Sequence, residues 1–306
     1  MDNSIFNRFR LTAAEQNLNV YGVSVYNNKT GQTAEHRFRS DDRVCMFSCS
    51  KTFTSIGVGI CRDRGLLQLS DKVLDFFPEF KSTAATGTER ITVEHLLNMA
   101  SGKILYWFDE ADKQISSQDF AKLFLEHPVT KEPGSYFYYS NACTYMLSRI
   151  IHKVTGQNMR DFLVPCLFDP LGIANPQWHT CPGGYTLGAT ELFLTTNQLL
   201  QLGILLINKG EYKGKRIVSS EYVELLHSRL VDSTPFDYTN DPENMAGYGY
   251  QIWNCTREHT YRADGMYAQF CVIAKDIDAV VAVTSHEEKA PNDIIRAVFN
   301  DILPLI

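Results

Sequence analysis

Ser48 and Lys51 mark the only place in the sequence where a serine stands three residues before a lysine. On a helix, positions i and i+3 share a face, so the Ser48 hydroxyl and the Lys51 amine could point into one cleft. Residues 48–64 lack proline and carry apolar residues at helical spacing, and Gly65 follows as a helix stop. Such a helix would bury Lys51, and burial near a helix N-terminus lowers the pKa of a lysine from its usual value of about 10.4. The pair therefore predicts a serine nucleophile with a lysine base. Taken alone, the spacing also fits a helix-start serine beside a solvated lysine.

A second candidate patch is the aromatic loop of residues 133–141, which leads into a helix expected at 142–155. Tyr139 and Asn141 stand two residues apart at this junction, so a phenol and an amide could enter the same pocket. The alternative interpretation is a core aromatic cluster in which Asn141 caps the helix. These residues alone leave both interpretations open.

The order and spacing of three motifs resemble the serine β-lactamase and penicillin-binding protein superfamily, in the branch that contains class C β-lactamases, D-Ala-D-Ala carboxypeptidases and small esterases. The motifs are Ser-x-x-Lys at Ser48 to Lys51, Tyr-x-Asn at Tyr139 to Asn141 and Gly-x-x-x-Gln at Gly265 to Gln269. Further phrases similar to the family stand at residues 91–102, 210–217 and 247–251. The resemblance covers most of the chain and implies a β-lactamase/transpeptidase-like fold.

The resemblance also implies a role for each motif residue. Ser48 would form an acyl-enzyme, Lys51 would take its proton, and Tyr139 would relay a proton to the leaving group and later from the attacking water. Asn141 would hold Lys51 and a substrate amide. The backbone N–H groups of Ser48 and Met266 would form the oxyanion hole. No metal or organic cofactor is implied.

The third motif departs from the penicillin-recognising pattern. Where those relatives carry Lys-Thr-Gly or His-Thr-Gly, this chain has Ala263-Asp264-Gly265. The cation and hydroxyl that would bind a substrate carboxylate are missing, and Asp264 would repel a carboxylate if it faced the cleft. An alternative register places His259-Thr260 at the motif but leaves Tyr261 where glycine is needed for close approach. The departure points toward neutral or cationic acyl compounds, with Asp264, Gly265 and Met266 at the substrate.

The elements that must position these residues fall into two groups. Strand patterns occur near both ends of the chain, and a largely helical middle separates them. The expected strands are 20–26, 33–39, 248–255, 260–263, 267–274 and 279–285; the expected helices include 92–99, 117–126, 142–155, 196–208, 220–227 and 291–303. This predicts an α+β protein in which terminal helices flank an antiparallel sheet and a helical lobe is inserted. We expect a discontinuous sheet lobe of residues 1–65 and 180–306, a mainly helical lobe of residues 66–179, and the active site between them.

Composition bounds the partners. Of the 306 residues, 44% are hydrophobic and 21% charged, which is typical of a globular protein. A net charge of −6 without a basic stripe argues against a nucleic-acid partner. The longest aliphatic stretch, 199–207, is too short to span a membrane, and residues 1–19 do not resemble a signal peptide, so we expect a cytoplasmic protein.

The eight cysteines form no C-x-x-C pair and the histidines form no metal spacing. Cys49 is interpreted as a packed residue because buried thiols keep a high pKa. The oligomeric state stays open.

Together these features predict a serine hydrolase that acts through an acyl-enzyme on small ester, amide or peptide substrates. The third motif favours esterase-like activity over β-lactamase activity. The alternatives are a D-Ala-D-Ala carboxypeptidase or β-lactamase, and a non-catalytic, penicillin-binding-like protein that only binds a ligand.

Overall fold

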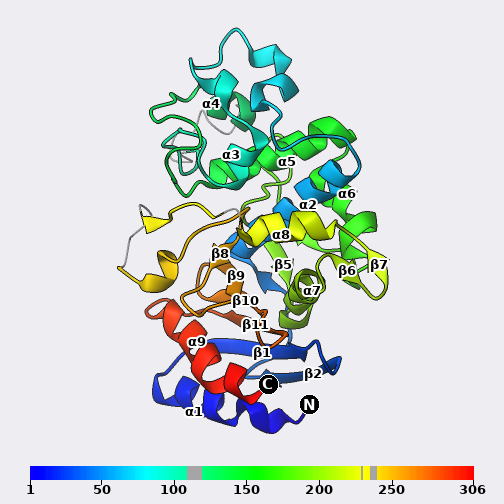
Figure 1. The fold of residues 1–306 in the computed structure, drawn as a ribbon, viewed down its shortest axis with the longest axis vertical. Coiled ribbons are helices and arrows are strands. Elements are labelled where there is room, and N and C mark those ends of the chain that lie inside the picture. Colours follow the sequence, from blue (N-terminus) through cyan, green and yellow to red (C-terminus); the bar gives the residue numbers. More distant parts are fainter. Residues whose placement is uncertain (109–118, 229, 235–239) are drawn as a thin grey trace.

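The computed structural model describes residues 1–108, 119–228, 230–234 and 240–306. Within these residues the chain builds a six-stranded antiparallel sheet in the order β2-β1-β11-β10-β9-β8 (Figure 1). Its strands are β1 (Val20–Asn27), β2 (Gln32–Arg37), β8 (Trp253–Asn254), β9 (Thr260–Gly265), β10 (Gln269–Ala274) and β11 (Ala279–Ser285). The sheet therefore joins the two ends of the chain, as predicted, and the α+β class is confirmed.

Both faces of the sheet are apolar at its central strands, because β10 and β11 are buried along their whole length and successive residues point to opposite sides. On one face Val272 of β10 and Val281 of β11 pack with the terminal helices α1 (Asn7–Glu15) and α9 (Pro291–Ala297). On the other face Ile273 and Val280 join the larger core, which includes α7 (Thr196–Ile207). Gly203 of α7 permits close packing there, since a Cβ at this position would overlap the Val280 side chain.

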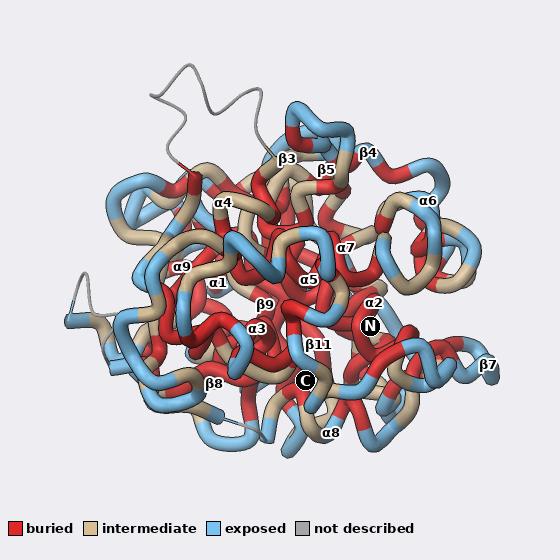
Figure 2. The backbone as a smooth tube through the Cα atoms, turned by 90° about the horizontal axis from the view of Figure 1, so that it is seen from above, coloured by how far each residue is buried: buried red, intermediate tan, exposed pale blue. Residues whose placement is uncertain are grey.

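The middle of the chain is mainly helical and lies beyond the β8 side of the sheet (Figure 1). Its helices are α2 (Ser50–Asp63), α3 (Val93–Leu97), α4 (Phe120–Glu126), α5 (Asn141–Thr155), α6 (Met159–Leu163) and α8 (Ser220–Ser228). Two smaller sheets accompany them: β3 (Val44–Cys45), β5 (Leu192–Leu194) and β4 (Gln177–Trp178) form one, and β6 (Glu211–Tyr212) and β7 (Lys215–Arg216) form the other. The buried centre runs through α2, α5 and the sheet (Figure 2). The exact division of the chain into lobes stays a prediction.

The segment before β8 differs from the sequence expectation. Residues 248–255 were expected to form one strand, but only Trp253–Asn254 pair with β9. Gln251 has a φ of 62°, which breaks the extended backbone. Its buried side chain instead donates to the Leu97 carbonyl at 2.8 Å and accepts from the Thr144 hydroxyl at 2.5 Å. Gln251 therefore links the sheet to α3 and α5.

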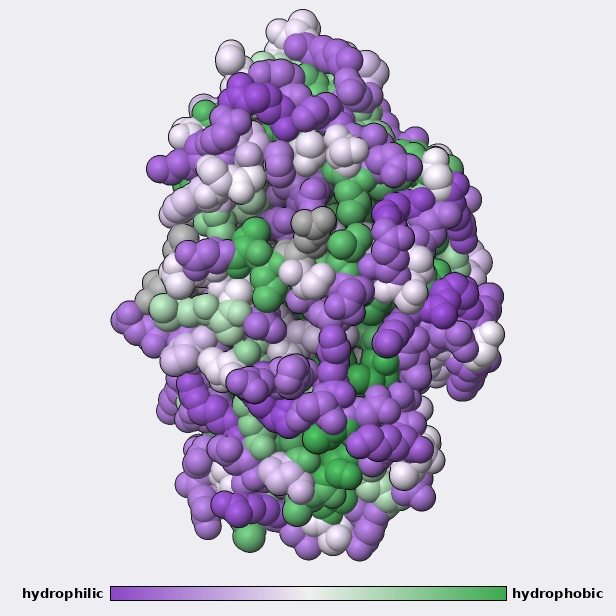
Figure 3. Space-filling view, viewed as in Figure 1, coloured by the Kyte–Doolittle hydropathy of each residue, from purple (hydrophilic) through white to green (hydrophobic). Residues whose placement is uncertain are grey.

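Other differences concern the ends of elements. The helix expected from Ser48 begins as a 3-10 turn at Phe47–Cys49 and becomes α-helical at Ser50. The helix expected at 117–126 begins at Phe120, and residues 117 and 118 lie outside the described part of the chain. No helix among the described residues is long and apolar enough to cross a bilayer. The face shown in Figure 3 is mostly polar, with apolar residues in small patches.

Candidate active site

Ser48 lies in the short turn that connects β3 to α2. The start of the turn is held in place because the Met46 N–H donates to the Leu192 carbonyl at 2.8 Å, next to the pairing of β3 with β5. Phe47 has a φ of 45°, a left-handed conformation that is rare for a bulky residue and is found where the surroundings enforce it. This turn leaves the half-buried Ser48 on the wall of a cavity at the start of α2.

Lys51 is buried on the first turn of α2, and its amine Nζ lies 2.9 Å from Ser48 Oγ. Nζ also donates to the Ala189 carbonyl at 2.9 Å. Every residue from Ser50 to Cys61 is buried, so the amine has no path to solvent along the helix. Desolvation by this burial lowers the pKa of Lys51 to about 7, although the charge of Asp264 acts in the opposite direction. The amine is therefore largely neutral just above neutral pH and can accept a proton.

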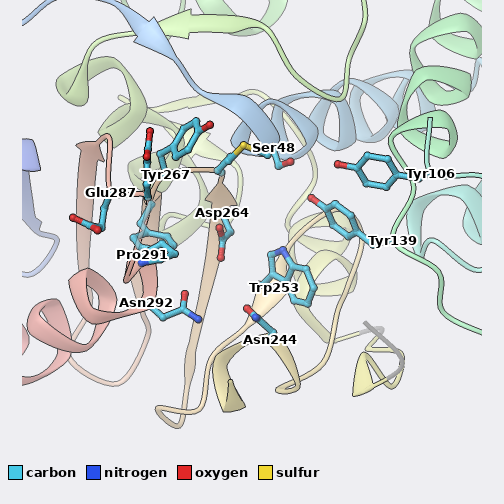
Figure 4. A pocket seen from close by; sticks show the side chains of 14 residues that line it. Ser48, Tyr106, Tyr139, Asn244, Trp253, Asp264, Tyr267, Glu287, Pro291 and Asn292 are labelled. Atoms are coloured by element: carbon cyan, nitrogen blue, oxygen red, sulfur yellow. The ribbon is translucent and has the colours of Figure 1, made fainter. Parts of the chain in front are cut away.

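Tyr139 also lies next to Ser48, at the end of the loop that leads into α5. Its ring is buried, with Lys51 Nζ 4.9 Å from the ring centroid. Burial raises the pKa of the Tyr139 phenol well above its usual range, while a side-chain hydrogen bond with Ser48 acts in the opposite direction. The phenol thus stays protonated at neutral pH. Figure 4 shows the hydroxyls of Tyr139 and Tyr106 both directed toward Ser48.

Asn141 begins α5 but is not the helix cap. Ser140 takes that position, and its hydroxyl accepts from the Cys143 N–H at 3.1 Å. Lys51 bonds to Ser48 and Ala189 and not to Asn141. Among the described residues, Asn141 Oδ1 is buried without a hydrogen-bond partner, and Asn141 is not among those that line the cavity. The amide is close in sequence to the site, while its predicted role at Lys51 and at the substrate stays a prediction.

The end of β9 lies against the Ser48 turn. A Cβ on Gly265 would overlap the Met46 carbonyl oxygen and lie 3.2 Å from the Cys49 nitrogen, so only glycine permits this approach. Gly265 and the following Met266 both line the cavity. This contact favours the register with Gly265 at the third motif, because Tyr261 lies at the far end of β9, away from the Ser48 turn. Gly265 occupies the position where the motif requires glycine.

The cavity in front of Ser48 has a volume of about 520 Å³. It is lined by aromatic, acidic and small residues: Ser48, Tyr106, Tyr139, Asn244, Trp253, Asp264, Gly265, Met266, Tyr267, Phe270, Glu287, Glu288, Pro291 and Asn292. Among the described lining residues, none is a lysine, arginine or histidine. Asp264 projects into the space bordered by Ser48, Trp253 and Asn292 (Figure 4). Burial raises the pKa of Asp264, and Arg262, at 2.8 Å, acts in the opposite direction.

Several of these contributions were not predicted from the sequence. The Ala189 carbonyl that orients Lys51 is a backbone group, and Tyr106 and Trp253 reach the cavity from loops and a two-residue strand without a motif of their own. Arg262 was also missed, although its spacing of two from Asp264 on a strand places both side chains on one face. Among the described residues, no His, Cys, Asp and Glu side chains are grouped so as to hold a metal ion.

The sequence as a whole matches known proteins. The Beta-lactamase family model matches residues 10–301. The chain belongs to the Beta-lactamase family. This family member is 28% identical over 162 residues to penicillin-binding protein 4* of Bacillus subtilis, which is 50% of this chain and 35% of that protein. It is 25% identical over 185 residues to lovastatin esterase of Penicillium rubens, which is 52% of this chain and 46% of that enzyme. The chain thus spans less than half the length of these two relatives.

Solved structures agree on the fold of this Beta-lactamase family member. The structure of EstCE1, described as a hydrolase with promiscuous acyltransferase activity, superposes with a TM-score of 0.76 and 16% identity. The superposition covers 98% of this chain and 98% of that one. The predicted β-lactamase/transpeptidase-like fold is confirmed.

The close approach of β9 to the Ser48 turn makes Gly265 a sensitive position in this family member. We expect Gly265→Ala to lower the free energy of unfolding by about 1–3 kcal/mol, the usual cost of overpacking. Urea titration of both forms measures the change. The neighbouring, exposed Met266 provides the control, since Met266→Ala should stay within about 0.5 kcal/mol. Equal stability of the two variants would show that β9 can move away from the turn at little cost.

Proposed function

We propose that this chain is a serine hydrolase that forms an acyl-enzyme on Ser48, with esters as its preferred substrates. The observation that carries the proposal is the buried Lys51 amine, which has a pKa lowered to about 7 and lies 2.9 Å from Ser48 Oγ. A serine hydroxyl becomes a competent nucleophile when a neutral base within this distance can remove its proton. Membership of a family of hydrolases supports the same reaction class.

The proton path follows from the protonation states of Lys51 and Tyr139. As Ser48 Oγ attacks the substrate carbonyl carbon, its proton passes to Lys51, which the Ala189 carbonyl holds in orientation. When the tetrahedral intermediate collapses, the bond to the leaving group breaks and that group needs a proton. The neutral Tyr139 phenol can donate one and recover it from Lys51. In deacylation the same groups act in reverse on a water molecule, which attacks the acyl carbon and restores Ser48.

The developing oxyanion requires donors that are in place before the reaction. The backbone N–H groups of Ser48 and Met266 are the proposed donors, supported by the contact of Gly265 with the Ser48 turn. Asn141, with its unpaired buried carbonyl oxygen, is proposed to bind a substrate amide. This role would apply only to substrates with an amide N–H, because an ester group offers no donor to Oδ1.

The preference for esters over β-lactams rests on the cavity wall. Ala263 is buried, Asp264 faces the cavity, and no cation is found among the described lining residues, so a substrate carboxylate would lack a cationic partner there. The relatives include both a penicillin-binding protein and an esterase, so similarity alone does not separate the two activities.

The nucleophile can be tested with a fluorophosphonate probe, which labels activated serines. We expect labelling of the unmodified protein and none of Ser48→Ala, with unchanged circular dichroism. Cys49→Ala is the matched control: the thiol is buried beside Ser48 and burial raises its pKa well above the usual range, so its removal should preserve labelling. Labelling that persists in Ser48→Ala would exclude this nucleophile. A protein that never labels would instead fit a ligand-binding relative without turnover.

The proposed roles of Lys51 as the base and Tyr139 as the proton relay can be distinguished by the pH dependence of kcat/KM for a neutral p-nitrophenyl ester. Below pH 7 Lys51 holds a proton and cannot accept another, so the rate should rise about tenfold per pH unit and level off above about pH 7. Lys51→Met should lower the rate by about a hundredfold or more and remove this inflection. Tyr139→Phe should lower it by a similar factor but keep the inflection. An inflection near pH 7 that survives in Lys51→Met would assign the base to another group.

Substrate preference can be measured with short-chain p-nitrophenyl esters, penicillins and cephalosporins. A charge-assisted bond to a substrate carboxylate contributes about 1.5–3 kcal/mol, so its absence should reduce kcat/KM for β-lactams by about ten- to a hundredfold. We expect turnover of the esters and weak or no hydrolysis of the β-lactams. The variant Asp264→Thr, which replaces the carboxylate on the cavity wall by a hydroxyl, should shift the ratio toward carboxylate-bearing substrates. Faster hydrolysis of cephalosporins than of esters by the unmodified protein would mean that another residue binds the carboxylate.

A further inference from the structure

Behind the cavity wall lies a buried arginine between two carboxylates. Arg262 is fully buried on β9, with Nη1 3.2 Å from Glu243 Oε2 and Nε 2.8 Å from Asp264 Oδ2. The Glu243 side chain is 4% exposed and the Asp264 side chain 23% exposed, so only Asp264 reaches the cavity. One positive and two negative groups leave this cluster with a net charge of −1 when all three are ionised.

The guanidinium of Arg262 cannot supply the cation that the third motif lacks. Nη1 also donates to the Asn254 carbonyl at 2.9 Å, and Nη2 donates to the Glu243 carbonyl at 3.1 Å. Nη1 and Nη2 are therefore engaged on the side away from the cavity, and Nε is engaged by Asp264. Arg262 acts on the substrate only through Asp264, whose carboxylate it holds in a fixed orientation.

The Asp264 carboxylate keeps capacity for a second donor. Among the described residues, only Arg262 donates to its side chain, and it does so at Oδ2. An ionised carboxylate has two acceptor oxygens, so Oδ1 can accept an N–H donor from a molecule in the cavity. Asp264 lines the same cavity as Ser48, which allows one substrate to contact both.

The rest of the cavity also favours a positive group. The rings of Tyr139 and Trp253 are stacked, with centroids 5.6 Å apart, and add an uncharged aromatic wall; Lys51 and Arg262 already lie over these two rings. Glu287 lies on the wall, although three backbone N–H groups, those of Asn19, Lys289 and Ala290, already donate to its carboxylate. Its charge still adds to the negative potential, and no described lining residue is positively charged.

We infer that the substrate is an ester or amide that bears an ammonium group, and that Asp264 is the specificity-determining residue that binds this group. Arg262 is a positioning residue that aims the Asp264 carboxylate. The inference rests on the proposed function, because the ammonium is selected only if the scissile carbonyl lies at Ser48.

Matched substrate pairs test this assignment. p-Nitrophenyl 6-aminohexanoate and p-nitrophenyl heptanoate have acyl chains of equal length, with and without an ammonium on the acyl side. 4-(Aminomethyl)phenyl acetate and 4-ethylphenyl acetate form the corresponding pair for the leaving-group side, and the first of them carries the N–H donors that the Asp264 carboxylate can accept. We expect kcat/KM to be at least about tenfold higher for the charged member of one pair, which also identifies the side that carries the ammonium. A ratio near one in both pairs overturns the inference.

Variants then assign the preference to Asp264. The ratio within the preferred pair should fall at least about tenfold in Asp264→Asn and recover in part in Asp264→Glu; the ratio cancels any general loss of activity. Asp75→Asn removes an equally charged carboxylate from the exposed surface and should leave the ratio unchanged. A preference that survives in Asp264→Asn assigns the ammonium to another residue and overturns the inference.

A measurement on the unmodified protein covers the case in which the Asp264 variants do not fold. n-Butylammonium should competitively inhibit hydrolysis of the neutral ester, whereas n-butanol at the same concentration should not; equal effects of the two overturn the inference. The outcomes remain distinguishable from those of the proposed function. If Ser48 does not label and neither member of a pair is hydrolysed, the serine hydrolase proposal itself fails. If Ser48 labels and the neutral esters are hydrolysed without any preference, only the ammonium assignment fails.

Discussion

The chemistry of this site depends on keeping the Lys51 amine out of water. A pKa of about 7 in place of 10.5 means that the fold disfavours the ammonium form by on the order of 5 kcal/mol. An unfolded chain would bind that proton more tightly between about pH 7 and 10.5, so this residue makes folding more favourable as the pH rises through that range. Below pH 7 Lys51 is protonated in the folded and the unfolded chain, so the folded protein bears the full free-energy cost of burying the ammonium. In the proposed mechanism, the buried surroundings of α2 therefore serve the reactivity of Lys51 at the expense of stability.

The second constraint is that the groups around Ser48 come from segments distant in the sequence. Pairing of β3 with β5 brings the Ser48 turn and the Ala189 segment together, and Gly265 lets β9 approach the same turn. The Gln251 side chain links the segment before β8 to α3 and α5. Because the loop that ends at Tyr139 leads directly into α5, this link also helps to position Tyr139. The site is thus assembled by backbone contacts at β3, β5 and Gly265 together with the buried side-chain bonds of Gln251.

The sequence predicted the parts of the structure that rest on local patterns. The apolar helix after Ser48, the strands near both termini and the junction at Tyr139 follow from periodicity and motif spacing, and all are present. The predicted strand at residues 248–252 is wrong. These residues have the aromatic pattern of a strand, but Gln251 has a positive φ and its side chain bonds to α3 and α5. Two contacts could not be predicted: the hydrogen bond of Lys51 to the Ala189 carbonyl and the ion pair of Arg262 with Glu243. Each joins segments that are distant in the sequence and has no local signal.

The buried cluster of Arg262, Glu243 and Asp264 would affect both the choice of substrate and the pKa of Lys51. A buried ion pair is weak evidence for stability, since the desolvation of its charges offsets most of their attraction, and apolar residues of similar volume could replace it. Its effect on the site is electrostatic: the Asp264 charge raises the pKa of Lys51 and so opposes the effect of burial.

A substrate ammonium beside Asp264 would neutralise this contribution and add a positive charge near the Lys51 amine. Both changes favour neutral Lys51. A cationic substrate would therefore bring the base into its reactive form on binding, whereas a carboxylate at the same place would keep Lys51 protonated. The ammonium group that Asp264 is proposed to select would in this way also favour the neutral form of Lys51, which activates Ser48.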